Sequence, residues 1–293
     1  MKKTMLIKHS ISKLLTGFFN ENIDVLSHSH IGGGSINTAL KVETNKGIFF
    51  VKHNSKHLYP AMFEKEALGL KLLRETGSIK VPDVVTFGNV DEDSFLVLNY
   101  IESGHKSRSF WDDFAKNLTA LHKNTSEKFG LDHDNYIGSL KQFNYWENTW
   151  TEFFRVQRLE IQIKMARDSS LLDRSIVSAF ERFYNRLDDI FPNEQSALVH
   201  GDLWSGNFMV GENGEPIILD PAVYYGHREM DLAMSQLFGG HPNEFYNSYN
   251  KYFPLEKGWQ KRMDYCNLYP LLVHVNLFGG GYVASVKSIV SRF

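Results

Sequence analysis

The chain has 293 residues, 42% of them hydrophobic and 23% charged, which is typical of a globular protein. Its 32 basic and 34 acidic residues leave a formal net charge of −2, so neither a nucleic acid nor a membrane surface is indicated as a partner. The single cysteine, Cys266, excludes an internal disulfide framework and a cysteine-based zinc site. With no signal peptide and no stretch apolar enough to span a bilayer, the sequence predicts a cytoplasmic protein.

The first hundred residues predict strands around a central helix. An amphipathic pattern at the start predicts a leading helix, and a turn at residues 45–47 separates two strand-like segments. A helical stripe of apolar residues follows, and two more strand-like segments come after it. The predicted ranges are 1–15 for the leading helix, 32–44 and 47–54 for the first strands, 59–77 for the central helix, and 81–90 and 94–101 for the last strands.

After a polar linker at residues 102–109, the chain is predicted to be mainly helical. The predicted ranges are 110–123, 148–166 and 175–191 for three helices, 197–202, 207–210 and 216–220 for three short strands, and about 230 onward for a helical tail. The sequence therefore predicts an α+β protein with two lobes. The smaller, β-rich lobe covers residues 1–101, and the larger, mainly helical lobe covers residues 102–293.

A glycine-rich segment, IGGGSIN at residues 31–37, lies at the start of the predicted hairpin. Glycines allow backbone N–H groups to approach phosphate oxygens closely. Gly33, Gly34 and Ser35 are therefore candidates for covering the phosphates of a nucleotide. Taken alone, such a segment is more often a plain turn.

Lys52 follows at the end of the strand after these glycines, where it could reach the phosphates of a bound nucleotide. A lysine in that position needs an anionic partner to hold it. Glu66 in the next helix, fourteen positions on (66 − 52 = 14), is the first choice, and Glu64 is the alternative. The plain interpretation is that all three are solvated surface charges, as most lysines and glutamates are.

Two further features come from the second half of the chain. In the segment HGDLWSGN, Asp202 and Asn207 are five positions apart (207 − 202 = 5), the spacing of the kinase catalytic loop. There the aspartate accepts the proton of the attacking hydroxyl and the asparagine oxygen binds a hard metal ion. Asp220 ends an apolar strand where a kinase has its metal-binding aspartate. A polar turn and a capping aspartate before Pro221 are the plain alternatives.

Together these features occur in the order and on the elements that a kinase requires. A glycine loop, a lysine, a helix glutamate, an aspartate–asparagine pair and a strand-end aspartate all match. The sequence therefore predicts a kinase-like phosphotransferase that uses ATP and Mg²⁺.

The H-G-D order around Asp202, where protein kinases have H-R-D, resembles the aminoglycoside phosphotransferase and choline kinase superfamily. Within it, the chain is very similar to the fructosamine kinases, or ketosamine-3-kinases, over about residues 10–290. The segments that carry the resemblance are GGGSIN, FVK, FEKEALGL, FGLDHDNYIG, HGDLWSGN, DPAVYYGHREMDLAMSQLFGG and NLFGGGY. The resemblance implies a bilobal protein kinase-like fold with ATP bound between the lobes. It also implies phosphorylation of the 3-hydroxyl of a ketoamine, the adduct of a sugar on an amine, with ribulosamines and erythrulosamines preferred to fructosamines.

The resemblance also implies roles for single residues. Backbone groups near Asn99, Tyr100 and Ile101 would hold the adenine. Trp204 and His274 are candidates for substrate contact, although a packing role is nearly as well supported for Trp204 and better supported for His274. The remaining residues are His200 and Asp231, which are expected to support the loop, and His227 and Glu229, whose roles stay open.

Three rival functions remain. The nearest is another small-molecule kinase of the same superfamily, acting on aminoglycosides, choline or homoserine, but the tail after Met230 is not rich in the acidic residues that a polycation needs. A nucleotide-binding regulator without catalysis is less favoured because Lys52, Asp202, Asn207 and Asp220 are all present. A protein kinase is disfavoured because no A-P-E segment follows Asp220.

Overall fold

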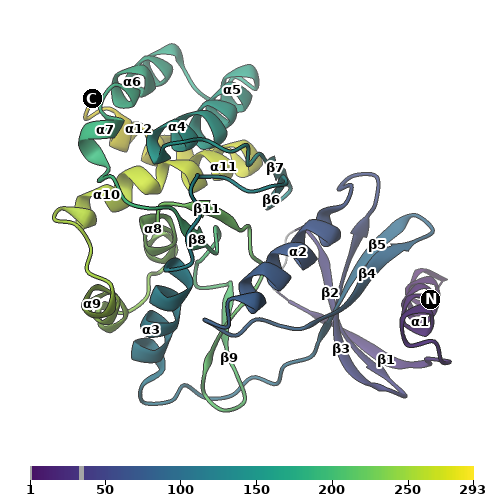
Figure 1. Cartoon of the computed structure of the whole chain (residues 1–293). Coiled ribbons are helices and arrows are strands. Elements are labelled where there is room, and N and C mark those ends of the chain that lie inside the picture. The colour runs from purple at the N-terminus through teal and green to yellow at the C-terminus, as the bar shows by residue number, and fades with distance from the viewer. Residues whose placement is uncertain (1, 33–35) are drawn as a thin grey trace. The chain divides into compact units, whose positions relative to one another are not determined.

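A five-stranded antiparallel sheet is the centre of the first part of the chain in the computed structural model, which describes residues 2–32 and 36–293 (Figure 1). Its strand order is β1-β2-β3-β5-β4. The strands are β1 (Val25–Ile31), β2 (Thr38–Thr44), β3 (Gly47–Ser55), β4 (Val84–Val90) and β5 (Asp93–Asn99). The predicted strands are therefore present, and β1 is an additional edge strand that the sequence pattern did not predict.

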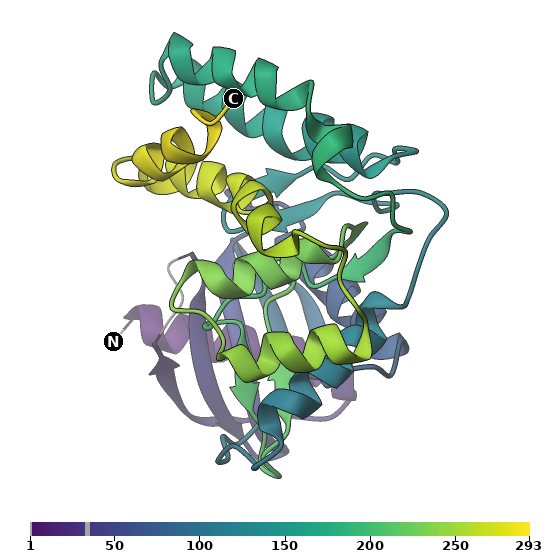
Figure 2. The same ribbon diagram turned by 90° about the vertical axis from the view of Figure 1, so that its left-hand side faces the viewer.

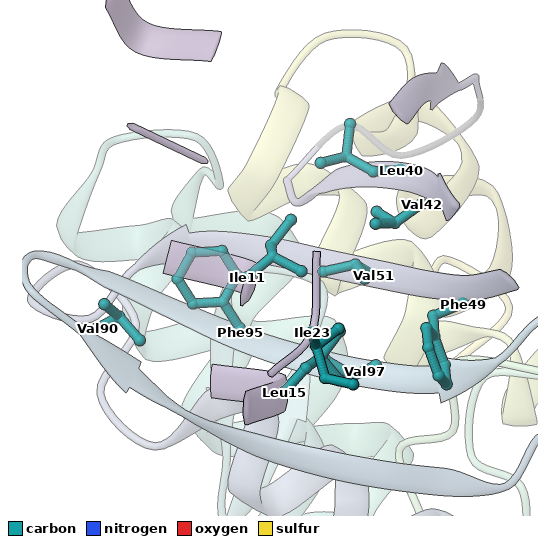
Figure 3. Close-up of a cluster of buried hydrophobic side chains, with 10 residues drawn as sticks. All are labelled: Ile11, Leu15, Ile23, Leu40, Val42, Phe49, Val51, Val90, Phe95 and Val97. Carbon is teal, nitrogen blue, oxygen red and sulfur yellow. The ribbon is translucent and has the colours of Figure 1, made fainter. Parts of the chain in front are cut away.

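One face of this sheet packs against the N-terminal helix α1 (Lys2–Phe19). Ile11 and Leu15, four residues apart, lie on the same side of α1 and enter a cluster of buried apolar side chains (Figure 3). Burying a side chain of this size contributes about 1.5–3 kcal/mol. The other members of the cluster are Ile23, Leu40, Val42, Phe49, Val51, Val90, Phe95 and Val97.

A second helix, α2 (Met62–Glu75), packs its apolar stripe against the sheet. Phe63, Ala67 and Leu70, at helical spacing, pack with Leu96 and Leu98 of β5. Helix α2 ends at Glu75, and the hydroxyl of the next residue, Thr76, donates a hydrogen bond of 2.7 Å to the Leu73 carbonyl. This packing fixes the orientation of α2, and with it the direction in which Glu66 points.

A short hairpin from later in the chain completes this part. It consists of β9 (Phe208–Val210) and β10 (Pro216–Ile218). Ile218 donates a backbone hydrogen bond of 3.0 Å to the carbonyl of Lys80, four residues before the start of β4. The chain consequently divides into an N-terminal unit, Met1–Phe110 with Met209–Asp220, and a C-terminal unit, Trp111–Phe208 with Pro221–Phe293. Asp220 is the last residue of the N-terminal unit, two positions after the end of β10.

The C-terminal unit is mainly helical. The views in Figures 1 and 2 show α8 and α9 running side by side. Its helices are α3 (Phe110–His122), α4 (Trp150–Phe153), α5 (Glu160–Asp168), α6 (Arg174–Tyr184), α7 (Leu187–Ile190), α8 (Glu229–Leu237), α9 (Asn243–Tyr252), α10 (Trp259–Cys266), α11 (Leu268–Phe278) and α12 (Tyr282–Val290). No helix of residues 2–32 and 36–293 is both long and apolar enough to cross a membrane.

Two details of the C-terminal unit differ from the predicted elements. The helix predicted over residues 148–166 is divided by a π-helix, η1 (Phe154–Leu159), that lies between α4 and α5. Two small sheets were also not predicted as pairs. They are β6 (Asn135–Ile137) with β7 (Leu140–Gln142), and β8 (Ala197–Val199) with β11 (Tyr224–Gly226).

Candidate active site

Lys52 in β3 is the centre of a charge cluster in the N-terminal unit. Only 5% of the residue is exposed. Its Nζ lies 2.7 Å from Glu66 Oε1 in α2 and 2.7 Å from Asp220 Oδ1 after β10. Glu64, the alternative partner, is exposed. The structure therefore brings together three residues that the sequence singled out, Lys52, Glu66 and Asp220.

The two carboxylates keep this lysine charged. Burial by itself would lower the pKa of Lys52, but the neighbouring Asp220 and Glu66 raise it above its usual value. Burial raises the pKa of Glu66, and the contact with Lys52 opposes that rise. The result is an ammonium group fixed in place by two anions, which is the preorganisation that binding of a phosphate group requires.

Asp220 has an uncommon backbone conformation. Its φ is +55°, in the left-handed region that non-glycine residues rarely adopt. Such strain costs about 1–3 kcal/mol and is concentrated at functional sites. Although Asp220 contacts the buried Lys52, its own side chain is 49% exposed. One carboxylate oxygen therefore faces the lysine while the group stays accessible to a ligand from solvent.

The catalytic-loop motif forms a tight turn in the C-terminal unit. The Trp204 amide donates to the carbonyl of Asp202 at 3.1 Å, and the Asn207 amide donates to the carbonyl of Trp204 at 3.0 Å. The side-chain nitrogen of Asn207 donates to the Asp202 carbonyl at 2.8 Å and to its Oδ2 at 2.9 Å. Both predicted functional groups are thus in contact, and because the Asn207 nitrogen makes both bonds, the Asn207 oxygen, the atom that a metal ion would take, is not used on Asp202.

Asp231 on α8 holds this loop from beneath. It is fully buried, and its carboxylate accepts hydrogen bonds from the backbone N–H groups of His200 at 2.7 Å and Gly201 at 2.9 Å. Burial by itself would raise the pKa of Asp231, but these groups and His122, whose Nε2 lies 3.0 Å away, lower it. The ring nitrogen Nδ1 of His200 accepts a hydrogen bond of 3.2 Å from the Asp202 amide. The contacts of His200 and Asp231 are therefore those of supports for the loop.

Gly201 occupies a position that only glycine fits. Its φ is +83°, and a Cβ placed on it would lie 2.1 Å from the Ala222 carbonyl oxygen and 3.2 Å from Tyr224 Cε1. The Ala222 amide donates to the His200 carbonyl at 2.9 Å. The loop backbone is thus pressed against the segment that follows Asp220.

Trp204 and His274 belong to one aromatic cluster. The Trp204 ring lies edge-on to Phe238 at 6.0 Å between centroids, and Phe238 lies 4.8 Å from the His274 ring. His274 also contacts Tyr282 at 4.9 Å, and its Nδ1 lies 2.7 Å from the Pro270 carbonyl oxygen. Both residues are half-buried, so each packs on neighbours while keeping part of its ring accessible. A role in substrate contact stays a prediction for both.

The other residues singled out from the sequence are placed as follows. Gly33, Gly34 and Ser35 lie outside the described residues. Asn99 ends β5, and its side-chain oxygen accepts a hydrogen bond from the Asp83 amide, while Tyr100 carries Lys41 over its ring at 4.4 Å. Ile101 follows, half-buried, outside any helix or strand. Their role in adenine binding stays a prediction.

Glu229 and His227, whose roles the sequence left open, are both buried, and their partners given below lie outside the catalytic-loop motif. Glu229 forms a bidentate ion pair with Arg262 at 2.6 and 2.7 Å. His227 is 1% exposed, and burial lowers its pKa to about 4, although Glu194 opposes the shift. Its Nδ1 accepts a hydrogen bond of 3.3 Å from the Glu229 amide. Both contribute to packing at the start of α8.

No cluster of three or more His, Cys, Asp or Glu side chains that could hold a metal ion occurs within residues 2–32 and 36–293. A magnesium ion that accompanies a nucleotide does not need one, because it keeps several waters and takes most other ligands from phosphates. Such an ion prefers hard oxygen ligands. The carboxylate of Asp220 and the side-chain amide oxygen of Asn207 are ligands of this kind.

Comparison with known proteins identifies the family. The family model of the fructosamine kinases matches residues 7–293. The chloroplastic protein-ribulosamine 3-kinase of Arabidopsis thaliana is 42% identical over 268 residues, which cover 90% of this chain and 81% of the relative. The chain belongs to the fructosamine kinase family. The resemblance predicted from the sequence and the prediction of a kinase are therefore confirmed.

Solved structures agree with this membership. The crystal structure of a candidate fructosamine-3-kinase from Haemophilus somnus matches with a TM-score of 0.87 and 29% identity, covering 97% of this chain and 96% of that one. An aminoglycoside phosphotransferase matches with a TM-score of 0.62 and 15% identity, covering 97% and 98%. The latter shows the fold alone. The predicted α+β kinase-like fold is confirmed for this member of the fructosamine kinase family.

Sequence reasoning missed one functional neighbour, His122. It ends α3, is 1% exposed, and joins Asp231 to Tyr249, whose hydroxyl lies 2.7 Å from its Nδ1. A histidine at the end of an apolar helical stripe is ambiguous from sequence alone. Only its position opposite Asp231, 109 residues away along the chain, shows what it supports.

Proposed function

We propose that this chain is a ketoamine 3-kinase, which transfers the γ-phosphoryl group of ATP to the 3-hydroxyl of a sugar adduct on an amine. The observation that carries the proposal is the pairing of Lys52 with both Glu66 and Asp220 in a kinase-like fold. The curated relative named protein-ribulosamine 3-kinase supports the choice of substrate class.

The N-terminal unit supplies the nucleotide side of the chemistry. Lys52 contacts the phosphates, and Glu66 keeps its ammonium group in place. Gly33, Gly34 and Ser35 cover the phosphates, and backbone groups at residues 99–101 hold the adenine.

The C-terminal unit supplies the acceptor side. The Asp202 carboxylate accepts the hydrogen bond of the 3-hydroxyl and orients it for attack. Because phosphoryl transfer passes through a loose transition state, positioning of this hydroxyl matters more than complete removal of its proton. An ordinary carboxylate basicity is sufficient for that role.

Mg²⁺, when bound with ATP, neutralises the charge that develops on the phosphates. Asn207 and Asp220 are the residues proposed to hold it. One oxygen of Asp220 already contacts Lys52, so the same carboxylate would hold both the ion and the ammonium group. The Asn207 amide nitrogen is bound to Asp202, which leaves its oxygen for the ion.

The substrate is proposed to be a ribulosamine or erythrulosamine in preference to a fructosamine. Trp204 and His274, joined through Phe238, form an aromatic surface in the unit that carries Asp202. Such a surface suits the apolar face of a sugar or the carbon chain of its amine. The cytoplasmic location predicted from the sequence also belongs to this proposal.

Turnover assays test the substrate class directly. ATP consumption is expected with ribulose–lysine and erythrulose–lysine adducts, more weakly with fructose–lysine, and not with kanamycin or choline. Phosphate should appear on the 3-oxygen, as ³¹P–¹H correlation spectra can show. Turnover of kanamycin or choline without any ketoamine turnover would replace the proposal by that of another small-molecule kinase.

A further inference from the structure

Arg158 is the largest fully buried side chain of the C-terminal unit, and its partners are all neutral. It is 0% exposed. Its guanidinium donates to the Phe143 carbonyl at 2.5 Å, the Gln157 carbonyl at 3.1 Å and the Asn144 Oδ1 at 2.7 Å. The Tyr224 ring lies 4.0 Å from its central carbon and carries further cation–π attraction.

Other buried arginines in the same unit are held differently. Arg228 and Arg262, 4% and 7% exposed, each form a bidentate ion pair, with Glu194 and Glu229 respectively. None of the ion pairs among residues 2–32 and 36–293 includes Arg158. A buried charge without a counter-charge costs several kcal/mol unless its hydrogen bonds are well made. The cost of burying the Arg158 charge must therefore be offset by something other than an ion pair.

The backbone that carries Arg158 is itself unusual. The residue lies in the π-helix η1, between the α-helices α4 and α5. Single π-helical turns are rare and are frequently found at functional sites. The same turn carries Arg155, which is 49% exposed and pairs with Glu160. One arginine of η1 is therefore an ordinary surface residue, and the other is directed into the core.

A chain of buried amides leads away from Arg158. Because a guanidinium has only donors, the atom of Asn144 that faces it must be the oxygen. The Asn144 nitrogen then donates to Asn135 Oδ1 at 3.1 Å, and the Asn135 nitrogen donates to the Val223 carbonyl at 2.8 Å. The cation at one end and the carbonyl at the other thus fix which way each amide is turned.

A second branch of these buried amides ends at Ala222, one residue before Val223. The Gln142 nitrogen donates to Asn135 Oδ1 at 2.8 Å and to the Ala222 carbonyl at 3.1 Å. The hydroxyl of Tyr269 donates to the Gln142 oxygen at 2.7 Å, which fixes the orientation of that amide as well. Both branches therefore bind carbonyl oxygens of the segment that follows Asp220.

That segment supports the loop that bears Asp202. Ala222 is the residue that binds His200 and presses on Gly201, and Tyr224 pairs with Val199 across β11 and β8. The Tyr224 ring touches Arg158 on one side and approaches the Gly201 position on another. A shift at Arg158 thus reaches the backbone next to Asp202 through two routes, the amide chain and the Tyr224 ring.

We propose that Arg158 is a positioning residue for phosphoryl transfer: its buried, carboxylate-free guanidinium orients the amides that fix residues 222–224, and through them the loop at Asp202. It does not touch substrate. The proposal rests on the proposed ketoamine kinase function. A displacement of about 1 Å at the reacting groups is enough to lower a rate by about 10²-fold, which sets the scale of the expected effect.

Arg158→Met in the full chain tests this. Its kcat per folded molecule is expected to fall by about 30–100-fold with a ribulosamine, while KM for ATP and for the ketoamine stays within about threefold. Arg158→Lys, which keeps the charge and some donors, is expected to recover part of the loss. Arg155→Met, in the same π-helix, is the matched control and should retain wild-type kcat.

The outcomes are distinguishable. If wild-type chain turns over no ketoamine, the proposed function fails before any variant is compared. An unchanged kcat per folded molecule in Arg158→Met, with only a lower melting temperature, overturns the proposal and makes Arg158 purely structural, as does a rise in KM alone. Should Arg158→Met fail to fold, Arg158→Lys decides: a kcat within threefold of wild type overturns the proposal, and a folded variant whose kcat is lower by more than threefold supports it.

Discussion

Lys52 in the N-terminal unit is held by two carboxylates, whereas Asp202 in the C-terminal unit is held by an amide, backbone groups and supports beneath its loop. The first arrangement fixes a charge with other charges. The second fixes a backbone, and the amide nitrogen of Asn207 donates a hydrogen bond to the carboxylate itself.

The difference follows from what each group is proposed to do. A phosphate-binding cation must stay charged and in place whether or not ATP is bound, so it carries its own counter-ions. A proton acceptor must remain available to the incoming hydroxyl, so it is positioned through its backbone instead. Four predictions test this contrast, from the largest expected effect to the smallest.

Asp202→Asn should be the most damaging change to activity. Loss of the positioned proton acceptor is expected to lower kcat by about 10²–10⁴-fold. KM for ATP should change little, since Lys52 and its partners lie in the other unit. Steady-state ATP consumption with a ribulosamine measures both constants, and Asp188→Asn, at an exposed site, is the control. A kcat within threefold of wild type would remove Asp202 from its assigned role.

Asp231→Asn should act on stability first. The replacement puts an amide nitrogen where the buried carboxylate accepts from His200, Gly201 and His122, and is expected to cost about 3 kcal/mol of unfolding free energy. All five tryptophans lie at or beyond residue 111, so their fluorescence in a urea titration reports the C-terminal unit. Asp264→Asn, which loses only an exposed pair with Arg292, should stay within about 0.5 kcal/mol. Equal losses in the two variants would contradict the support role.

Acid should weaken the C-terminal unit through His227. Its folded-state pKa is about 4, below the ordinary value of 6.5, so the unfolded state binds more protons as the pH falls. Stability from this group is complete above pH 6.5 and falls by about 2 kcal/mol at pH 5. His227→Asn should flatten the pH dependence of unfolding followed by tryptophan fluorescence. An equally steep loss in that variant would assign the acid sensitivity to other groups.

Glu66→Gln should have the smallest effect, because Asp220 still holds Lys52. The expected loss in kcat/KM for ATP is about tenfold. Glu64→Gln, on the same helix but exposed, is the matched control and should equal wild type. If Glu66→Gln were as inactive as a variant without Lys52, Asp220 alone could not hold Lys52, and the two carboxylates would not share that role.

The residues of the site could be predicted because they lie at characteristic intervals from one another along the chain. Asp202, Asn207 and Asp220 are recognised from intervals along the chain, and Glu66 from its distance to Lys52. The sequence ranked Glu66 ahead of Glu64 as the partner of Lys52, and the ion pair in the structure agrees with that ranking, since both lie on the same helix and its packing turns Glu66 toward Lys52.

Other parts of the fold lack such a signal. β1 is mostly exposed, so its residues do not alternate between apolar and polar as a half-buried strand would. The π-helix η1 depends on a backbone hydrogen-bond pattern that the spacing of apolar side chains does not encode. Arg158 belongs to the same class, because an arginine beside apolar residues is indistinguishable from a surface arginine until its acceptors, 14 and 15 positions away, are known.

Gly201 has a consequence for how this enzyme can be controlled. Kinases that are switched on by phosphorylation bind the new phosphate on their activation loop through arginines, and the H-R-D motif has an arginine where this chain has Gly201. Here that position has no room even for a Cβ, because the Ala222 carbonyl occupies the space. The packing that secures the loop therefore also closes this position to an arginine that could bind such a phosphate.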